Sequence, residues 1–184
     1  MHKKIILHPI KYTGAELHSL WIYEKFNLLG DSIVAFSGEC EIDFEKMIDL
    51  EDVLAKEKIT STNMLHFIIE HFERNLEKAI LRQYLSMAIL KDILQNKVNE
   101  KIIRKGNNLY EKDKKITVSI ATLSPVSSLI HIGINIDSKN TPILTKGLED
   151  YNIDWQIVAK EFLDEYIKNY EEIKRAKCKV RGAK

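Results

Sequence analysis

The stretch RKGNNLYEKDKKITVSIATLSPVSSLIHIGINID, from Arg104 to Asp137, decides the fold of this chain. Apolar and polar residues alternate in two runs within it, 115–121 and 129–136. Such alternation with β-branched residues is typical of half-buried strands, whose side chains point to opposite faces in turn. Pro125 and the serines around it predict a turn between the runs. We therefore expect an antiparallel hairpin centred on Pro125.

The two faces of this hairpin are expected to differ in character. One should be dry core, formed by the isoleucines of both runs and Val118. The other would collect Lys115, Thr117, Ser119, His131, Gly133 and Asn135. The expected register pairs Ser119 with His131, Thr117 with Gly133, and Lys115 with Asn135. This polar face is either solvent-exposed, as antiparallel sheets allow, or the floor of a cleft in which a glycine admits a ligand.

The composition limits the class of protein. The chain has 184 residues with a formal net charge of +1, which gives no overall electrostatic attraction to nucleic acid or membranes. We expect one domain, 1–176, and a basic tail, 177–184, that either contacts phosphates or is solvated. No apolar run is long enough to span a membrane. The two cysteines form no disulfide framework, so a reduced, cytoplasmic setting is expected.

Outside the hairpin, the patterns predict strands and helices in an α+β arrangement. Strands are expected before Pro9 and at 32–38 (continuing toward 43), 63–72 and 101–105. The first helix should begin near Thr13, because Thr13 and Glu16 match a capping box, and should end at Gly30. Two further helices are expected, at 73–98 and from Asp154 to about 173.

Two groups of residues away from the hairpin are candidates for function. Asp49, Glu51 and Asp52 offer the oxygen ligands that magnesium prefers, or they simply form an acidic helix N-terminus. His66 and Glu70 share one face of the strand at 63–72 and are candidate ligand-binding residues, although His66 is alternatively a satisfied interior histidine. The spacing to His71 is one residue longer than in the His-x-x-Glu-His metalloproteases, which excludes that class.

Two segments resemble biotin protein ligases. NNLYEKDKKI, 107–116, is similar to their Asn-Asp-(Leu-Tyr), four residues, Lys-Leu segment, and IGIN, 132–135, is similar to the Gly-x-Asn strand that follows. Over nearly its whole length the chain resembles the domain of unknown function 366 family. That likeness is carried by MIDLED (47–52), MLHFIIEHF (64–72), the GNNLY turn and VSIATLSPVSSLIHIGINI (118–136). The resemblance implies a biotin/lipoate ligase-like fold, with a mixed, largely antiparallel sheet flanked by helices.

The resemblance also implies a role for one lysine. In those ligases a lysine contacts the acyl carbonyl or acyl-phosphate oxygen, and Lys115 matches it; an ammonium there would stabilise a developing oxyanion. The expected ligand-binding residues around it are Arg104, Asn107, Asn108, Thr117, Ser119, His131, Gly133, Asn135, His66 and Glu70. The ligases' glycine- and arginine-rich phosphate loop corresponds here to an acidic region, 38–52, that keeps only Gly38.

Three functions stay open on the sequence. The first is acyl or nucleotidyl transfer to or from a small molecule in a pocket centred on Lys115, with ATP and magnesium as candidate cofactors. The second is a non-catalytic small-molecule binding or interaction module. The third is a metal-dependent hydrolase that uses the acidic region with His66 and Glu70. A homodimer is plausible because edge strands need cover.

Overall fold

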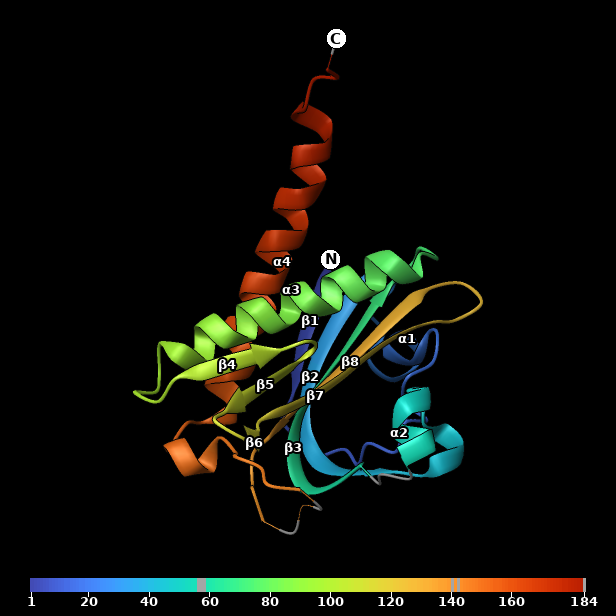
Figure 1. The fold of residues 1–184 in the computed structure, drawn as a ribbon. Coiled ribbons are helices and arrows are strands. Elements are labelled where there is room, and N and C mark those ends of the chain that lie inside the picture. Colours follow the sequence, from blue (N-terminus) through green and yellow to red (C-terminus); the bar gives the residue numbers. More distant parts are fainter. Residues whose placement is uncertain (56–58, 140, 142, 184) are drawn as a thin grey trace.

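Figure 1 shows the computed structural model, which describes residues 1–55, 59–139, 141 and 143–183. A five-stranded sheet has the order β1-β2-β3-β8-β7, and its strands are β1 (His2–Ile6), β2 (Ser32–Ile42), β3 (Ile59–His71), β8 (Ser128–Asn135) and β7 (Thr117–Leu123). β1 and β2 are parallel, and the other neighbours are antiparallel. A smaller sheet contains β4 (Ile102–Lys105), β5 (Asn108–Glu111) and β6 (Lys114–Lys115). The expected mixed, largely antiparallel α+β fold is confirmed.

Two helices close one face of the large sheet. α3 (Leu76–Gln95) packs across β7 and β8, and α4 (Trp155–Lys179) packs on β1 and β2 and then projects beyond the body (Figure 1). Each begins at a side chain that accepts a backbone N–H, as the sequence indicates for α4: Asn75 from Lys78 and Asp154 from Gln156. No helix in the described residues is long and apolar enough to cross a membrane.

The connection before β2 covers part of the opposite face. Tyr12, Leu17 and Trp21 pack there against apolar residues of β2 and β3. The capping box forms, since Thr13 N donates to Glu16 at 2.7 Å, but α1 (Trp21–Phe26) starts only at Trp21. The expected start near Thr13 is wrong because Gly14 and Leu20 have φ of +86° and +68°, which a right-handed helix excludes. The short helices of the remaining connections are η1 (Phe44–Lys46), α2 (Leu50–Ala55) and η2 (Glu149–Tyr151).

The predicted hairpin exists, but its register differs by one residue. Thr117 lies opposite Ile134 and Ser119 opposite Ile132, so the predicted pairs with Gly133 and His131 are wrong. The loop contains four residues, closed by Ser124 N donating to Ser127 O at 2.8 Å, and its centre lies after Pro125 instead of on it. A slip of one residue exchanges the faces of a strand. Val118 and Ile120, not Thr117 and Ser119, therefore share a face with the polar residues of β8.

Candidate ligand pocket

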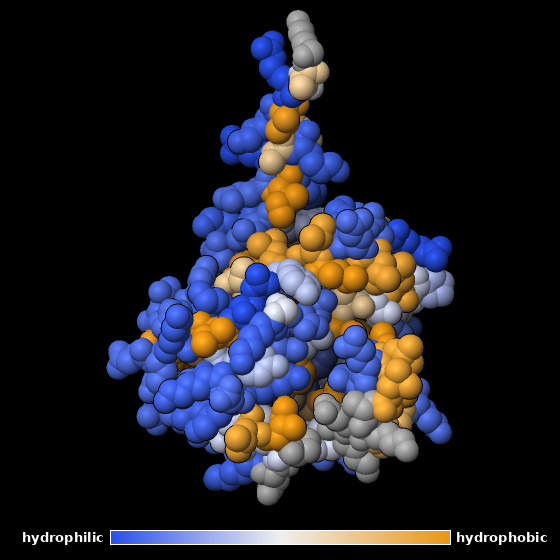
Figure 2. Space-filling view, viewed as in Figure 1, coloured by the Kyte–Doolittle hydropathy of each residue, from blue (hydrophilic) through white to orange (hydrophobic). Residues whose placement is uncertain are grey.

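A cavity of about 530 Å³ opens on the part of the sheet that the 10–30 connection leaves uncovered. Its floor is the face of β3, β7 and β8 that carries Met64, Val118 and His131. The acidic segment around α2 forms one wall, and Lys115 with Thr141, Ile143 and Thr145 forms another. Figure 2 shows the surface hollowed beside β7 in this region. The predicted cleft and the acidic region thus meet in one place.

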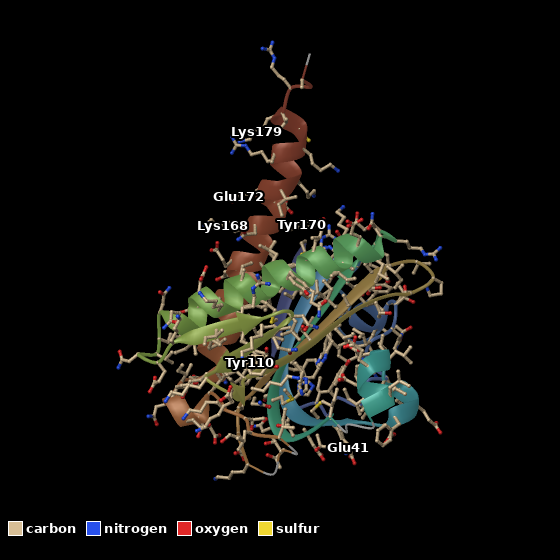
Figure 3. All side chains as sticks on the ribbon, in the orientation of Figure 1. Glu41, Tyr110, Lys168, Tyr170, Glu172 and Lys179 are labelled. Carbon is tan, nitrogen blue, oxygen red and sulfur yellow. The ribbon has the colours of Figure 1, made fainter. Side chains whose placement is uncertain are left out.

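Lys115 borders the cavity from a backbone that is held on both sides. Its N–H donates to Leu144 O at 2.9 Å. Its carbonyl accepts from Lys146 N at 3.0 Å and from Asn135 Nδ2 at 3.3 Å. It pairs in register with Tyr110, labelled in Figure 3. These bonds fix the backbone from which the half-buried side chain of Lys115 borders the pocket.

A series of hydrogen bonds links two asparagines and a serine beside this lysine. Asn107 Nδ2 donates to Ser119 O at 3.2 Å, and Ser119 Oγ donates to Asn107 O at 2.6 Å. Asn108 Nδ2 donates to Asn107 Oδ1 at 3.1 Å. All three residues border the cavity. Within the part of the chain that the structure describes, Asn108 Oδ1 is buried without a hydrogen-bond partner.

Two stacked aromatic rings form the other end of the pocket. The rings of Tyr12 and His131 have centroids 3.8 Å apart and an angle of 9° between their planes. His131 Nε2 lies 3.1 Å from His66 Nδ1, and His66 Nε2 lies 3.2 Å from the carbonyl oxygen of Gly38. Burial lowers the pKa of His66 to about 4 and the pKa of His131 well below its ordinary value. Both imidazoles are therefore neutral at neutral pH.

The acidic residues Asp49, Glu51 and Asp52 also border the cavity. Asp49 Oδ1 accepts from Glu51 N at 3.0 Å, so one of its oxygens stabilises the start of α2. The described ranges contain no group of three or more acidic, histidine or cysteine side chains arranged to hold a metal ion. These carboxylates supply negative charge to one wall of the pocket, whether or not a cation joins them.

The structure brings nine of the predicted site residues to the cavity: Asn107, Asn108, Lys115, Ser119, His131, Asn135, Asp49, Glu51 and Asp52. The other five lie outside its lining, and they are Arg104, Thr117, Gly133, His66 and Glu70. His66 is a buried partner of His131, which fits the interior alternative.

The other four have local roles. Arg104 donates to Gly106 O at 3.1 Å, and Thr117 Oγ1 accepts from Leu109 N at 2.8 Å under α3. A Cβ at Gly133 would meet Met64 and Val118 side chains, so neighbouring strands fill its space. Glu70 accepts from Leu20 N at 3.0 Å and Ser127 Oγ at 2.7 Å, which fixes the start of α1.

Several pocket residues were not predicted. Tyr12 comes from an irregular connection whose sequence has no periodicity that could place it. Val118 and Ile120 were assigned to the dry face because of the register error, although they line the cavity with Ile42, Ile59 and Met64. These side chains give the pocket an apolar middle between its two polar ends. Only the correct length of the Ser124–Ser127 loop would have revealed that arrangement.

Residues 1–181 match the family model "Domain of unknown function (DUF366)". The chain belongs to this family. It is 38% identical over 173 residues to "Uncharacterized protein MJ0805" of Methanocaldococcus jannaschii, which covers 90% of this chain and 78% of that protein. It also matches the structure of a "Protein of Unknown Function" from Pyrococcus horikoshi with a TM-score of 0.92 and 32% identity, over 99% of this chain and 100% of the other.

Structures of biotin and lipoate ligases share the fold at low identity. The biotin protein ligase of Aquifex aeolicus in complex with biotin and ATP matches with a TM-score of 0.63 and 16% identity, over 94% of this chain and 72% of the other. P. falciparum LipL1 in complex with lipoate matches with a TM-score of 0.56 and 15% identity, over 92% and 63%. The predicted ligase-like fold of this DUF366 chain is thereby confirmed.

Proposed function

We propose that this DUF366 protein binds an acyl-type small molecule in the pocket, with the Lys115 ammonium on the carbonyl or carboxylate oxygen, and that it passes the acyl group of an activated acyl compound to an acceptor nucleophile as the leaving group departs. One observation carries the proposal: Lys115 borders the cavity, and no acidic side chain among the described residues forms an ion pair with its Nζ. A half-buried cation without a protein anion is suited to a ligand oxygen or a developing oxyanion.

The shape of the cavity suits such a ligand. Its volume of about 530 Å³ lies within the range of roughly 300–1,000 Å³ that is usual for small-molecule sites. The wall of Ile42, Ile59, Met64, Val118 and Ile120 can cover an apolar chain. The neighbouring structures that hold biotin and lipoate contain carboxylic acids with an apolar body, and this likeness of chemistry supports the proposal.

A nucleotide is the second candidate ligand, and the pocket fits it less well. A phosphate cradle needs free backbone amides beside small residues. At Gly38, an added Cβ would lie 2.0 Å from the carbonyl oxygen of Ile10, so the protein's own backbone occupies that space. The carboxylates of Asp49, Glu51 and Asp52 would repel phosphates unless magnesium accompanied them. The lack of a fit for phosphates favours a non-catalytic binding module as the alternative function.

A hydrolase that uses His66 and Glu70 is not supported by the geometry. Both ring nitrogens of His66 already have protein partners. The carboxylate of Glu70 accepts hydrogen bonds from Leu20 and Ser127. Glu70 lies four residues from His66 along β3, a distance of about 13 Å. Neither side chain is free to hold a metal ion in common with the acidic wall.

Thermal-shift measurements with octanoate, biotin, lipoate, ATP and ATP with magnesium test the proposal. A ligand at about 100 times its Kd should stabilise the wild-type protein by about 2.7 kcal/mol. Lys115→Ala should lose this shift. Lys114→Ala is the matched control, because Lys114 is the exposed neighbour on β6 and does not border the cavity; its shift should equal that of the wild type.

The outcomes of these measurements distinguish an enzyme from a binding module. An acid that binds wild type and Lys114→Ala but not Lys115→Ala supports the Lys115 pocket, and product formed from that acid with ATP identifies an enzyme. Binding without product identifies a binding module. Equal shifts in wild type and Lys115→Ala, or no shift with any acid, would overturn the proposal.

A further inference from the structure

The buried histidine pair has a fixed pattern of protons. A carbonyl oxygen only accepts hydrogen bonds, so His66 Nε2, which lies 3.2 Å from Gly38 O, must carry a proton. A neutral imidazole has a single N–H, so His66 Nδ1 is an acceptor. His131 Nε2, 3.1 Å away, must therefore donate to it. The Nδ1 atom of His131 is left with a lone pair and no proton.

That lone pair belongs to the pocket. His131 borders the cavity and is 2% exposed. No described residue forms a hydrogen bond with its Nδ1, while Tyr12 covers one face of the ring. The ring can neither rotate nor change tautomer without breaking the bond to His66 or placing two N–H groups in conflict. His131 is thus an acceptor of fixed orientation in a nearly buried position at the wall of the pocket.

We propose that His131 is the specificity-determining residue of the pocket: it accepts a hydrogen bond from an uncharged N–H or O–H donor of the ligand and rejects a carboxylate or phosphate oxygen at that position. Facing a lone pair, an unprotonated oxygen would lose its hydration and gain no bond. His131 and Asn135 lie four residues apart on β8, or about 13 Å. Asn135 Nδ2 donates to the backbone carbonyl of Lys115, so the His131 acceptor and the backbone of Lys115 lie toward opposite ends of the pocket.

The class of ligand follows from these two ends. It is an elongated molecule with an acyl or carboxylate oxygen at Lys115, an apolar middle, and an amide, urea-type or hydroxyl donor at His131. The part that concerns Lys115 rests on the proposed function. The part that concerns His131 does not, because it follows from the hydrogen bonds of the histidine pair alone.

Isotope-labelled histidine NMR, which reports the protonation of each ring nitrogen, tests the His131 part in the wild-type protein. At neutral pH, His131 should be protonated at Nε2 only, with assignment by a His131→Gln variant. His71 is an internal control with the reverse pattern. Its Nδ1 lies 3.3 Å from Asp31 Oδ2 and its Nε2 lies 2.8 Å from the Tyr166 hydroxyl, so its proton should be on Nδ1. A proton on His131 Nδ1 would overturn the proposal.

Three small probes of similar size then test selection at that atom. Acetamide, which has an N–H donor, should move the His131 Nδ1 resonance toward the hydrogen-bonded position. Acetonitrile and acetate, which lack a donor at neutral pH, should not. The same response should persist in Lys115→Ala, so failure of the Lys115 proposal is distinguishable from failure of this one. An equal response to all three probes, or none to acetamide, refutes the selection of donors by His131.

A His66→Phe variant removes the acceptor for the His131 N–H while keeping a ring in the cluster. His131 should then populate both tautomers and lose the preference for acetamide. If the variant does not fold, the wild-type tautomer and the probe series still decide the matter. An unchanged His131 tautomer in a folded His66→Phe protein would show that His66 does not set it.

Discussion

The two faces of the five-stranded sheet use the same strands but are closed in different ways. On β8, Ile130, Ile132 and Ile134 lie in the dry core under α3 and α4. The alternate residues include His131 and Asn135, which border the cavity on the face that the 10–30 connection only partly covers. One strand thus serves the fold with one set of side chains and the pocket with the other. Substitutions on the two faces should therefore separate stability from binding.

Phe67→Ala should have the largest effect, because it removes a side chain from the closed face. Phe67 is fully buried, and its ring centroid lies 4.6 Å from that of Phe162 on α4. Deleting a buried phenylalanine typically costs about 3–5 kcal/mol, since the transfer free energy is lost and a cavity remains. Chemical denaturation should show this loss in the free energy of unfolding.

Val118→Ala is the counterpart on the open face. Val118 is half-buried and already borders a cavity, so truncating it creates no new enclosed void. The free energy of unfolding should fall by about 1 kcal/mol or less. If the two substitutions cost the same, the cavity face is packed as tightly as the helix-covered face, and the comparison fails.

Gly38→Ala should have the next largest effect, because it disturbs the contact between β2 and the backbone of the 10–30 connection. The new Cβ would lie 2.0 Å from Ile10 O and 2.7 Å from Ile10 C. This backbone cannot easily move, since Ile10 N donates to Ser37 O and Tyr12 N donates to Glu39 O. Overpacking of this kind costs about 3 kcal/mol. A melting temperature equal to that of the wild type would show that the connection is loosely held.

Much of this fold follows from local patterns. The alternation in β8 identified its buried isoleucines, and the capping side chain of Asp154 marked the start of α4. The strand expected at 63–72 corresponds to the second part of β3. Such features depend on residues close together in sequence, which is why a single chain reveals them.

The pocket was harder to predict because it depends on register and on irregular backbone. Because the loop has four residues in place of a turn on Pro125, Val118 and Ile120, not Thr117 and Ser119, share the face of His131, although Ser119 still borders the cavity. Tyr12 reaches His131 from an irregular segment whose backbone is held beside β2 by hydrogen bonds with Glu39 and Glu41. The capping box of Thr13 and Glu16 forms even though the helix starts only at Trp21, so its presence in the sequence could not predict where the helix begins. Long-range geometry, not propensity, decides these positions.

His66→Gln should change the pH dependence of stability. The pKa of His66 is about 4 in the folded state and ordinarily about 6.5, so the unfolded state binds more protons between these values. The wild type should therefore lose stability as the pH falls from about 6.5 to 4, by about 2 to 3 kcal/mol from this residue. Glutamine can keep both hydrogen bonds but does not titrate. Denaturation series across this range should show a shallower slope for the variant.

The control for this prediction is the other buried histidine network. His71 is bonded to Asp31, whose pKa is lowered well below its ordinary value by hydrogen bonds from His71, Tyr170 and Phe72 N, against the opposing effect of burial. Tyr170 reaches this network from α4 (Figure 3). This carboxylate stabilises the protein above about pH 3.9, and its contribution is lost only at lower pH. Asp31→Asn should flatten that more acidic range. Because Asp31 raises the pKa of His71 against the effect of burial, the same variant should make the slope between pH 6.5 and 4 steeper, the opposite of the effect of His66→Gln. Identical profiles for both variants would contradict the separation of the two networks.

Gly133→Ala should have the smallest effect, and it sharpens the contrast with Gly38 on the same face. The new Cβ would lie 2.7 Å from Met64 Cε and 3.0 Å from Val118 Cγ2. Unlike the backbone beside Gly38, the end of a methionine side chain is flexible, and Met64 borders the cavity into which it can shift. The free energy of unfolding should change by less than about 1 kcal/mol. Because the displaced methyl group takes up pocket volume, affinity for an acyl ligand should fall even though stability does not. A loss of stability equal to that of Gly38→Ala would mean that Met64 has no room to move. The cavity would then result from the segments that surround it, and the residues at its floor would be tightly packed.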